Sequence, residues 1–167
     1  MSGRLSDWLR ALQRRRLLRR LRDPAFRFLF EVPPPDEWVA LDCETTGLDV
    51  RTDEIISIGA VRIVGNRILT SQRLELLIRP HGEMRPESIC VHRLRNRDLD
   101  SGVSIEQAVH TLLHFIGSRP LVGYYLEFDV AMLNRVVVPM LGIGLPQPKI
   151  EVSALYYDHQ FALLPPY

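Results

Sequence analysis

Two carboxylates, Asp42 and Glu44, interrupt the apolar stretch WVALDCETTGLD of residues 38–49. On a β-strand, residues i and i+2 point to the same face, so both acids project together while Cys43 points the opposite way. At about 3.3 Å of rise per residue, their Cα atoms lie roughly 6.7 Å apart. Side chains can converge from that spacing on a catalytic two-metal pair, whose ions lie about 3.5–4 Å from each other.

The chemistry of these two acids favours a hard divalent cation. Unpaired carboxylates on a buried strand are costly unless cations neutralise them, and oxygen ligands without His or Cys favour Mg²⁺ or Mn²⁺ over zinc. Thr45, Thr46 and Gly47 then turn the chain and leave hydroxyls and backbone N–H groups near the acids. A second interpretation is a solvated strand end or pairing with arginines, which is the commoner case for a bare Asp-x-Glu.

Length and composition are those of an ordinary globular domain. The 167 residues are 46% hydrophobic and 25% charged, which suffices for one core. Charged residues interrupt every apolar run before about 18 residues, so no stable membrane insertion is expected. The N-terminus lacks the apolar segment of a secretory signal, and two cysteines make neither a disulfide framework nor a CxxC zinc motif. Cytoplasm is therefore the expected location.

Charge divides the chain into a basic arm and a mildly acidic remainder. Residues 1–31 contain nine arginines and three acids, a net charge of +6, which leaves −5 for residues 32–167. Interrupted helical periodicity that ends at Pro24 predicts a basic helical extension over residues 1–31. The prolines of residues 32–37 predict an extended linker, and the principal domain spans residues 38–167. The arm could contact a nucleic-acid backbone, a partner or anionic lipid, although a charge run is more often a solvated face.

Hydrophobic patterning predicts strands first and then alternating helices and strands. The first strand begins at residues 38–41, and residues 55–64 and 67–78 form two more strands around a Gly65-Asn66 turn. The clearest helix follows Ser104, which forms a capping box with Gln107, and Gly117 ends it. A short strand, a helix and a further strand and helix follow within residues 119–125, 127–142 and 148–158. This order predicts an α/β fold with a mixed sheet flanked by helices.

The string DCETTGL (residues 42–48) resembles the first motif of the DEDD-type (DEDDh-like) 3′→5′ exonucleases, the family of the proofreading epsilon subunit of bacterial DNA polymerase III. EIISIGAVRIVGNRI resembles the second strand and hairpin of that family, and residues 86–133 resemble its central segment and second motif. Many members have His-Asn before a Phe-Asp pair, whereas this chain has Tyr124-Tyr125 before Phe128-Asp129. The resemblance covers about residues 37–157 and implies a ribonuclease H-like exonuclease fold.

The resemblance also implies roles for individual residues. Asp42 would bridge two ions of Mg²⁺ or Mn²⁺, with Glu44 on one ion and Asp129 on the other, and these three would be the catalytic residues. Metal-activated water would attack the last phosphodiester in line and release nucleoside 5′-monophosphates. The positions implied to bind the terminal nucleotide are Thr45, Leu48, Ile89, His92 and Phe128.

Structural interpretations of the same residues stay open. Asp129 could be an acid favoured by the dipole at a helix N-terminus. Cys43 faces away from the acids, which indicates core packing. The remaining alternatives are a surface or capping position for His92, packing positions for Leu48 and Phe128, and strand core for Tyr124 and Tyr125.

The third motif of the family, H-x₄-D or Y-x₃-D, has no match after the second motif, where the family places it. Five residues after His159 stands Leu164, and four residues after Tyr156 and Tyr157 stand Gln160 and Phe161. We therefore expect a domain whose C-terminal part is missing. Three carboxylates without a positioned base predict a poorly held second ion and impaired catalysis, because a general base contributes about 10²–10⁴-fold.

Two functions from different classes follow. The first is a 3′→5′ exonuclease that acts on single-stranded or frayed DNA, with RNA not excluded, in proofreading or repair. The second is a catalytically impaired exonuclease-like adaptor or nucleic-acid-binding module. QFALLP (residues 160–165) faintly resembles the Gln-plus-apolar peptides that bind sliding clamps, although it also reads as a linker. A polymerase or a sliding clamp is accordingly a candidate partner.

Overall fold

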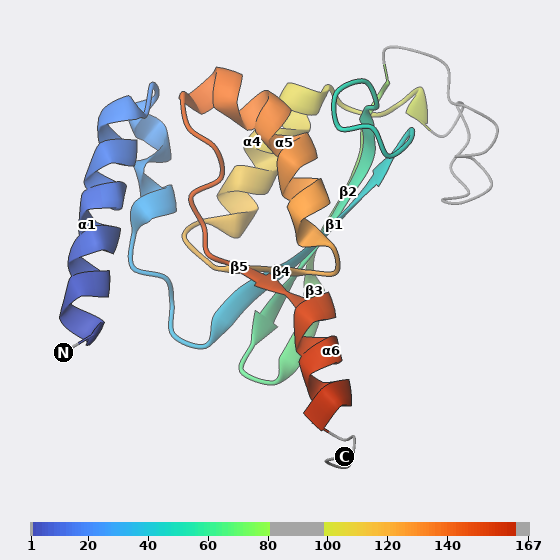
Figure 1. Cartoon of the computed structure of the whole chain (residues 1–167). Coiled ribbons are helices and arrows are strands. Elements are labelled where there is room, and N and C mark those ends of the chain that lie inside the picture. Colours follow the sequence, from blue (N-terminus) through green and yellow to red (C-terminus); the bar gives the residue numbers. More distant parts are fainter. Residues whose placement is uncertain (1, 81–98, 163–167) are drawn as a thin grey trace.

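The computed structural model describes residues 2–80 and 99–162. Figure 1 shows how its elements are arranged. In chain order they are α1 (Ser2–Arg20), the 3₁₀-helix η1 (Pro24–Phe30), β1 (Glu37–Thr45), β2 (Ile55–Val64), β3 (Arg67–Leu77), α4 (Ile105–Ile116), β4 (Leu121–Gly123), α5 (Leu126–Leu141), β5 (Lys149–Glu151) and α6 (Val152–Ala162). The expected sequence of strands followed by alternating helices and strands is confirmed.

The strands form one mixed sheet in the order β3-β2-β1-β4-β5. β2 pairs antiparallel with both β1 and β3, whereas β4 pairs in parallel with β1 and with β5. Gly65, at φ +58°, makes the predicted turn between β2 and β3. The pairing between β1 and β4 ends at Ala40, so among the described residues the C-terminal half of β1 has no strand partner on that edge.

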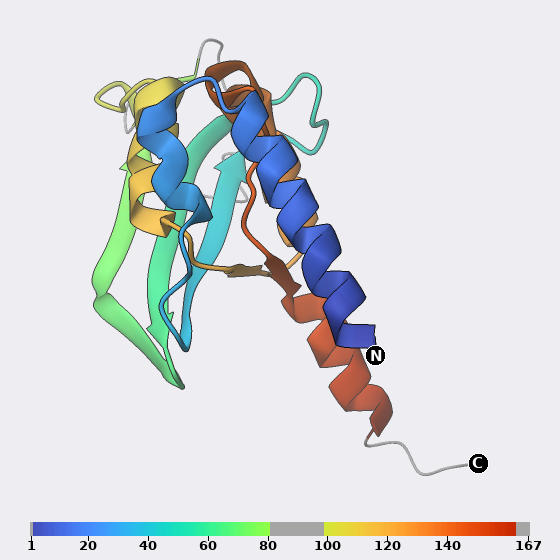
Figure 2. The same ribbon diagram turned by 90° about the vertical axis from the view of Figure 1, so that its left-hand side faces the viewer.

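The helices α4 and α5 cover one face of the sheet (Figures 1 and 2). The capping box of Ser104 and Gln107 is present, and Gly117 ends α4, both as predicted. The apolar stripe of α4 lies in the same buried core as Val39 and Leu41, the residues of β1 that alternate with its acids and are 0% and 3% exposed. This alternation turns Ala40 and Asp42 to the opposite face of the sheet.

The basic arm packs against the rest of the chain. Phe26, Leu29 and Phe30 of η1 are buried in the same core as the sheet, and Arg14 of α1 donates to the carbonyl oxygen of Phe30. The backbone N–H of Arg22 donates to Leu141 at the end of α5. The division into an arm, a linker and a domain remains a prediction.

The opposite face of the sheet carries a groove of about 530 Å³. Asp42, Gly59, Val61 and Tyr124 are among its lining residues, so the groove runs from the middle of the sheet to the end of β4. Figure 1 shows α6 continuing from β5 and extending away from the sheet. No helix in the described part of the chain is long and apolar enough to cross a membrane.

Candidate active site

The end of β1 brings Asp42 next to Asp129 of α5. Because β4 stops short, the backbone N–H of Cys43 lacks a strand partner on that edge, and it donates to Oδ1 of Asp129 at 2.9 Å. Asp129 is 4% exposed, whereas Asp42 is exposed beside the groove on the neighbouring position of β1. Two acids that are 87 positions apart in the chain therefore share one corner of the molecule.

The electrostatics of this corner are unfavourable for two negative charges. Burial, and after it the charge of Asp42, raises the pKa of Asp129 to about 6, although the N–H of Cys43 opposes the shift. Desolvation by the surrounding protein also raises the pKa of Asp42, although its side chain still reaches solvent. Desolvation raises the pKa of the Cys43 thiol, and the nearby Asp129 raises it further, so Cys43 stays a neutral packing residue. A divalent cation would relieve the repulsion between the two carboxylates.

Glu44 follows on the same face of β1 as Asp42, half-buried and opposite Ser57 of β2. Within residues 2–80 and 99–162, however, no group of three or more His, Cys, Asp or Glu side chains lies close enough together to hold a metal ion. The donor set of Asp42 and Asp129 nevertheless fits Mg²⁺ or Mn²⁺, which often bind through one or two carboxylates together with water and phosphate. Ligation by Glu44 stays a prediction.

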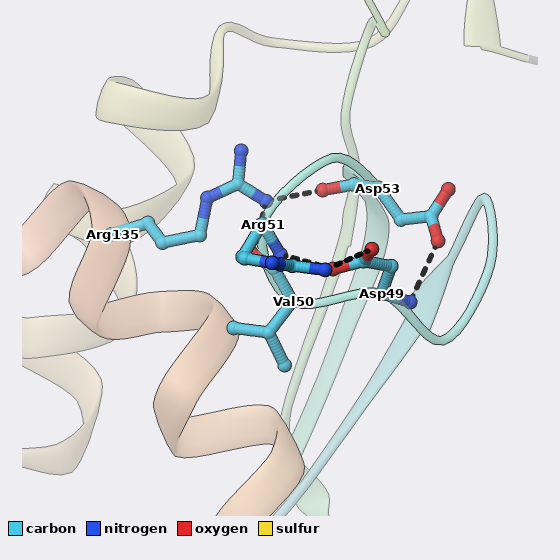
Figure 3. A network of polar contacts seen from close by, with 5 residues as sticks. All are labelled: Asp49, Val50, Arg51, Asp53 and Arg135. Atoms are coloured by element: carbon cyan, nitrogen blue, oxygen red, sulfur yellow. Dashed lines mark hydrogen bonds and ion pairs between the residues drawn. The ribbon is translucent and has the colours of Figure 1, made fainter.

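The loop after β1 is built around Asp53, a buried acid that the sequence analysis missed (Figure 3). Its Oδ2 accepts from the backbone N–H of Asp49 at 2.8 Å, and its Oδ1 accepts from the hydroxyl of Thr46 at 3.2 Å. A Cβ on Gly47 would lie 2.5 Å from Oδ2 of Asp53, so this position requires glycine. From α5, Arg135 donates to the carbonyl oxygens of Val50 and Asp53.

The N-terminus of α5 is fixed by a second missed acid, Glu151 of β5. One carboxylate oxygen accepts from the backbone N–H of Tyr125 and the other from that of Leu126, both at 2.8 Å. Ser153 donates to the same carboxylate, and its hydroxyl is the main cause of the lowered pKa of Glu151. This clamp sets the start of the helix that carries Asp129.

The residues predicted to bind the terminal nucleotide have different surroundings. Thr45 is half-buried and donates its hydroxyl to the carbonyl oxygen of Gly47 at 2.7 Å. Leu48 is 85% exposed, while Phe128 is partly buried against the core. Ile89 and His92 lie outside the described residues. The nucleotide-binding roles of all five remain predictions.

Tyr124 and Tyr125 are exposed, at 56% and 60%, so the strand-core interpretation of these two residues is wrong. β4 ends at Gly123, where a Cβ would lie 2.9 Å from the carbonyl oxygen of Leu41 and from the side chain of Leu126. The chain therefore leaves the sheet directly before the tyrosines, and both rings turn to the surface.

The local signals for the missed residues were weak. Asp53 and Arg135 stand in loop and helix contexts where charged residues are common, and only their long-range partners make them special. Glu151 is an acid at a strand end followed by Ser153, a pattern with many solvated examples. A turn glycine followed a few positions later by an acid could have indicated Asp53. Its carboxylate occupies the space that a side chain at position 47 would need.

Comparison with known proteins assigns the chain to a family. A family model described as Exonuclease matches residues 39–157, which include Asp42, Glu44 and Asp129. The chain therefore belongs to the exonuclease family, and the expected family and α/β fold are confirmed. Members of this family generally use divalent metal ions.

Individual relatives agree with this assignment. A PolC-type DNA polymerase III of Thermotoga maritima is 34% identical over 118 residues, which are 71% of this chain and 8% of that protein. The DNA polymerase III subunit epsilon of Aquifex aeolicus is 30% identical over 114 residues, which are 68% of this chain and 55% of the subunit. The chain thus spans about half of the epsilon subunit and a small part of the polymerase.

Solved structures support the fold. A zinc-bound complex of Escherichia coli exonuclease I with single-stranded DNA superimposes with a TM-score of 0.66 at 10% sequence identity. The match covers 76% of this chain and 30% of that one. A product-bound exonuclease I structure gives a TM-score of 0.65 over 76% of this chain. The similarity places the mixed sheet and its helices in the ribonuclease H-like architecture.

Proposed function

We propose that the chain carries a metal-dependent 3′→5′ exonuclease site that removes the terminal nucleotide of single-stranded or frayed DNA as a 5′-monophosphate. The observation that carries the proposal is the hydrogen bond from Cys43 to Asp129, which joins the second motif of the family to the Asp42 position of the first. The chain also belongs to an exonuclease family. A role in proofreading or repair, beside a polymerase or a sliding clamp, is part of this proposal.

The residues of the candidate active site would have different roles in such a reaction. Asp42 and Asp129 would hold Mg²⁺ or Mn²⁺, with Glu44 as the further ligand. A bound divalent ion lowers the pKa of an attacking water and stabilises the leaving 3′-oxygen. Leu48, exposed at the loop tip, and Phe128, beside Asp129, would position the terminal sugar and base, together with Thr45, Ile89 and His92.

The loop around Asp53 supplies rigidity rather than chemistry. Its hydrogen bonds fix the turn at Gly47 and present Leu48 to solvent at a defined place. An exposed leucine on a rigid loop binds a nucleotide with less loss of conformational entropy than the same leucine on a mobile one. The clamp of Glu151 serves the same purpose for Asp129.

The test is degradation of a 5′-labelled single-stranded oligonucleotide at high protein concentration with Mn²⁺. We expect products that shorten from the 3′ end, with no shortening in EDTA or when the terminal linkages are phosphorothioates. Asp42→Ala should reduce the rate about 100-fold or more, because it removes a ligand and a charge at the reacting centre. Glu106→Gln, an exposed acid in the first turn of α4, is the matched control and should be unaffected.

The alternative function has its own outcome in this experiment. No H-x₄-D or Y-x₃-D motif follows Asp129 in the given sequence, and a nucleic-acid-binding adaptor is therefore the second candidate function. Binding of the oligonucleotide without any cleavage, in the presence of Mn²⁺ and at high protein concentration, would favour that function over the exonuclease.

A further inference from the structure

Four tyrosines gather where β4 and β5 lead into α5 and α6. Tyr124 and Tyr125 stand between β4 and α5, and Tyr156 and Tyr157 lie on α6. Their exposures are 56%, 60%, 56% and 51%. These four residues are called the tyrosine cluster below. Large aromatic side chains normally bury most of their area, so four half-exposed rings at one end of a sheet need an explanation.

The rings of the cluster are organised. Tyr124 and Tyr125 meet edge to face with centroids 4.7 Å apart, and Tyr156 and Tyr157 do so at 6.0 Å. The last residues of β4 and β5, Gly123 and Glu151, pair directly, so the segments that carry the two tyrosine pairs leave the sheet side by side. Tyr125, more than Tyr157, raises the pKa of Tyr124. The cluster is therefore one surface contributed by two segments of the chain.

The backbone of Tyr125 is held in an unfavourable conformation. Its φ and ψ are 53° and 35°, the left-handed region, which a bulky residue with a Cβ rarely adopts. The carboxylate of Glu151 holds both backbone N–H groups at this turn at 2.8 Å. The strain does not bury the ring, because Tyr125 is 60% exposed. Gly or Asn would make the same turn more easily, so folding alone does not account for a tyrosine here.

The cluster adjoins the candidate active site. Tyr124 lines the groove of about 530 Å³ together with Asp42, and Tyr125 immediately precedes the helix that carries Asp129. A strand that placed its last phosphodiester at Asp42 could lay its preceding bases along this groove and onto the rings. Tyrosine faces stack on any base, which gives affinity without sequence preference.

We infer that the tyrosine cluster is a stacking platform for the bases next to the 3′ end of a single-stranded nucleic acid. The inference rests on the proposed exonuclease function for its placement of the strand, and it adds a binding surface on the side chains of β4–α5 and α6. Stacking is an uncharged interaction, so its contribution should be nearly independent of salt, unlike contacts with phosphates.

The test measures binding rather than cleavage. The whole 167-residue chain is titrated in EDTA with a fluorescein-labelled oligothymidylate of twelve nucleotides, and the dissociation constant follows from the anisotropy. Tyr125→Asn removes the ring but suits the left-handed backbone, whereas Tyr125→Phe keeps the ring. Trp8→Ala removes a similarly exposed aromatic residue, at 59%, from α1 and is the matched control.

Tyr125→Asn should weaken binding about five-fold or more, while it raises the melting temperature by about 1–4 °C through relief of strain. Tyr125→Phe and Trp8→Ala should change the dissociation constant less than about two-fold. Affinity and stability would then move in opposite directions, which a purely structural role of Tyr125 does not produce. An oligonucleotide that lacks the base at the stacked position should bind the original protein more weakly than the intact oligonucleotide does. Tyr125→Asn should bind both oligonucleotides equally, because the stacking contact is already lost.

Two results would overturn the inference. The first is a dissociation constant that changes neither in Tyr125→Asn nor in the double variant Tyr124→Ala, Tyr157→Ala. The cluster would then be a surface that contacts another protein. The second is an abasic effect that persists undiminished in Tyr125→Asn. The proposed exonuclease fails separately: tyrosine-dependent binding without cleavage supports the platform alone, whereas cleavage abolished by Asp42→Ala with tyrosine-independent binding supports the exonuclease alone.

Discussion

Two aspartates of this chain are equally buried and entirely different in their surroundings. Asp53 is 5% exposed and Asp129 is 4% exposed. The carboxylate of Asp53 accepts hydrogen bonds from the backbone of Asp49 and from the hydroxyl of Thr46, and Gly47 leaves room for it. The carboxylate of Asp129 accepts from Cys43, faces the charge of Asp42, and has its pKa raised to about 6.

The difference shows that burial alone does not mark a catalytic acid. A buried carboxylate surrounded by donors holds a loop in place, because the hydrogen bonds offset its desolvation. A buried carboxylate next to a second acid is destabilised in its charged form, which is the condition expected of a site that receives a cation. In this chain the first kind fixes the loop after β1 and the second kind lies at the candidate active site.

The largest expected effect on stability is at Asp53, the acid whose carboxylate is surrounded by hydrogen-bond donors. Asp53→Ala should lower the free energy of unfolding by about 3 kcal/mol, because the N–H of Asp49 and the hydroxyl of Thr46 both lose a partly buried acceptor and the buried site of the carboxylate is left empty. Urea denaturation followed by circular dichroism measures this change. Asp100→Ala, at an exposed acid, is the control and should stay within about 0.5 kcal/mol. Equal denaturation midpoints for Asp53→Ala and the control would contradict the comparison.

A smaller effect of opposite sign is expected at Asp129. Its pKa of about 6 in the folded chain exceeds the value of about 3.9 for an unfolded aspartate, so the folded state binds its proton more tightly. The stability contributed by this group is complete below about pH 4 and is lost as the pH rises through 6. Asp129→Asn keeps an acceptor for Cys43 without the charge and should therefore stabilise the metal-free chain at pH 7 by about 1–3 kcal/mol.

Urea denaturation in EDTA between pH 4.5 and 8 tests this expectation. The difference between the original chain and Asp129→Asn should grow from pH 4.5 to pH 7 and then level off. Mn²⁺ at ten times its dissociation constant should stabilise the original chain by about 1.4 kcal/mol and leave Asp129→Asn nearly unchanged. If the stability difference between the two proteins did not depend on pH, folding would not raise the pKa of Asp129, and the expectation would be wrong.

The sequence predicted one of these two aspartates and missed the other for a physical reason. Asp129 follows a short strand at the start of a helix and stands in a family pattern, so its place could be predicted before any coordinates. Asp53 acts through a hydroxyl seven positions earlier and a turn glycine that leaves it space. Hydrophobic periodicity carries no information about such contacts.

The same distinction applies to the fold. The α4 helix was predicted with both of its ends, because the capping box and Gly117 are local signals. The left-handed backbone of Tyr125 was not predicted, since local propensity opposes it and Glu151, 26 positions away, enforces it. Predictions from sequence are therefore strongest where neighbouring residues decide the structure.

The smallest expected effect tests whether the two aspartates are mechanically linked through α5. This helix carries Asp129, and six positions later Arg135 donates to the carbonyl oxygens of Val50 and Asp53 in the loop. Arg135→Met should cost only about 1 kcal/mol, because the aliphatic packing is kept and the freed carbonyls lie near solvent. Hydrogen exchange of the amides of residues 47–53 should nevertheless accelerate, since the loop loses its attachment to the helix.

Arg51→Ala, which removes an exposed partner of Asp49 within the loop, is the control and should leave that exchange unchanged. Equal acceleration in both variants would show that the loop moves independently of α5.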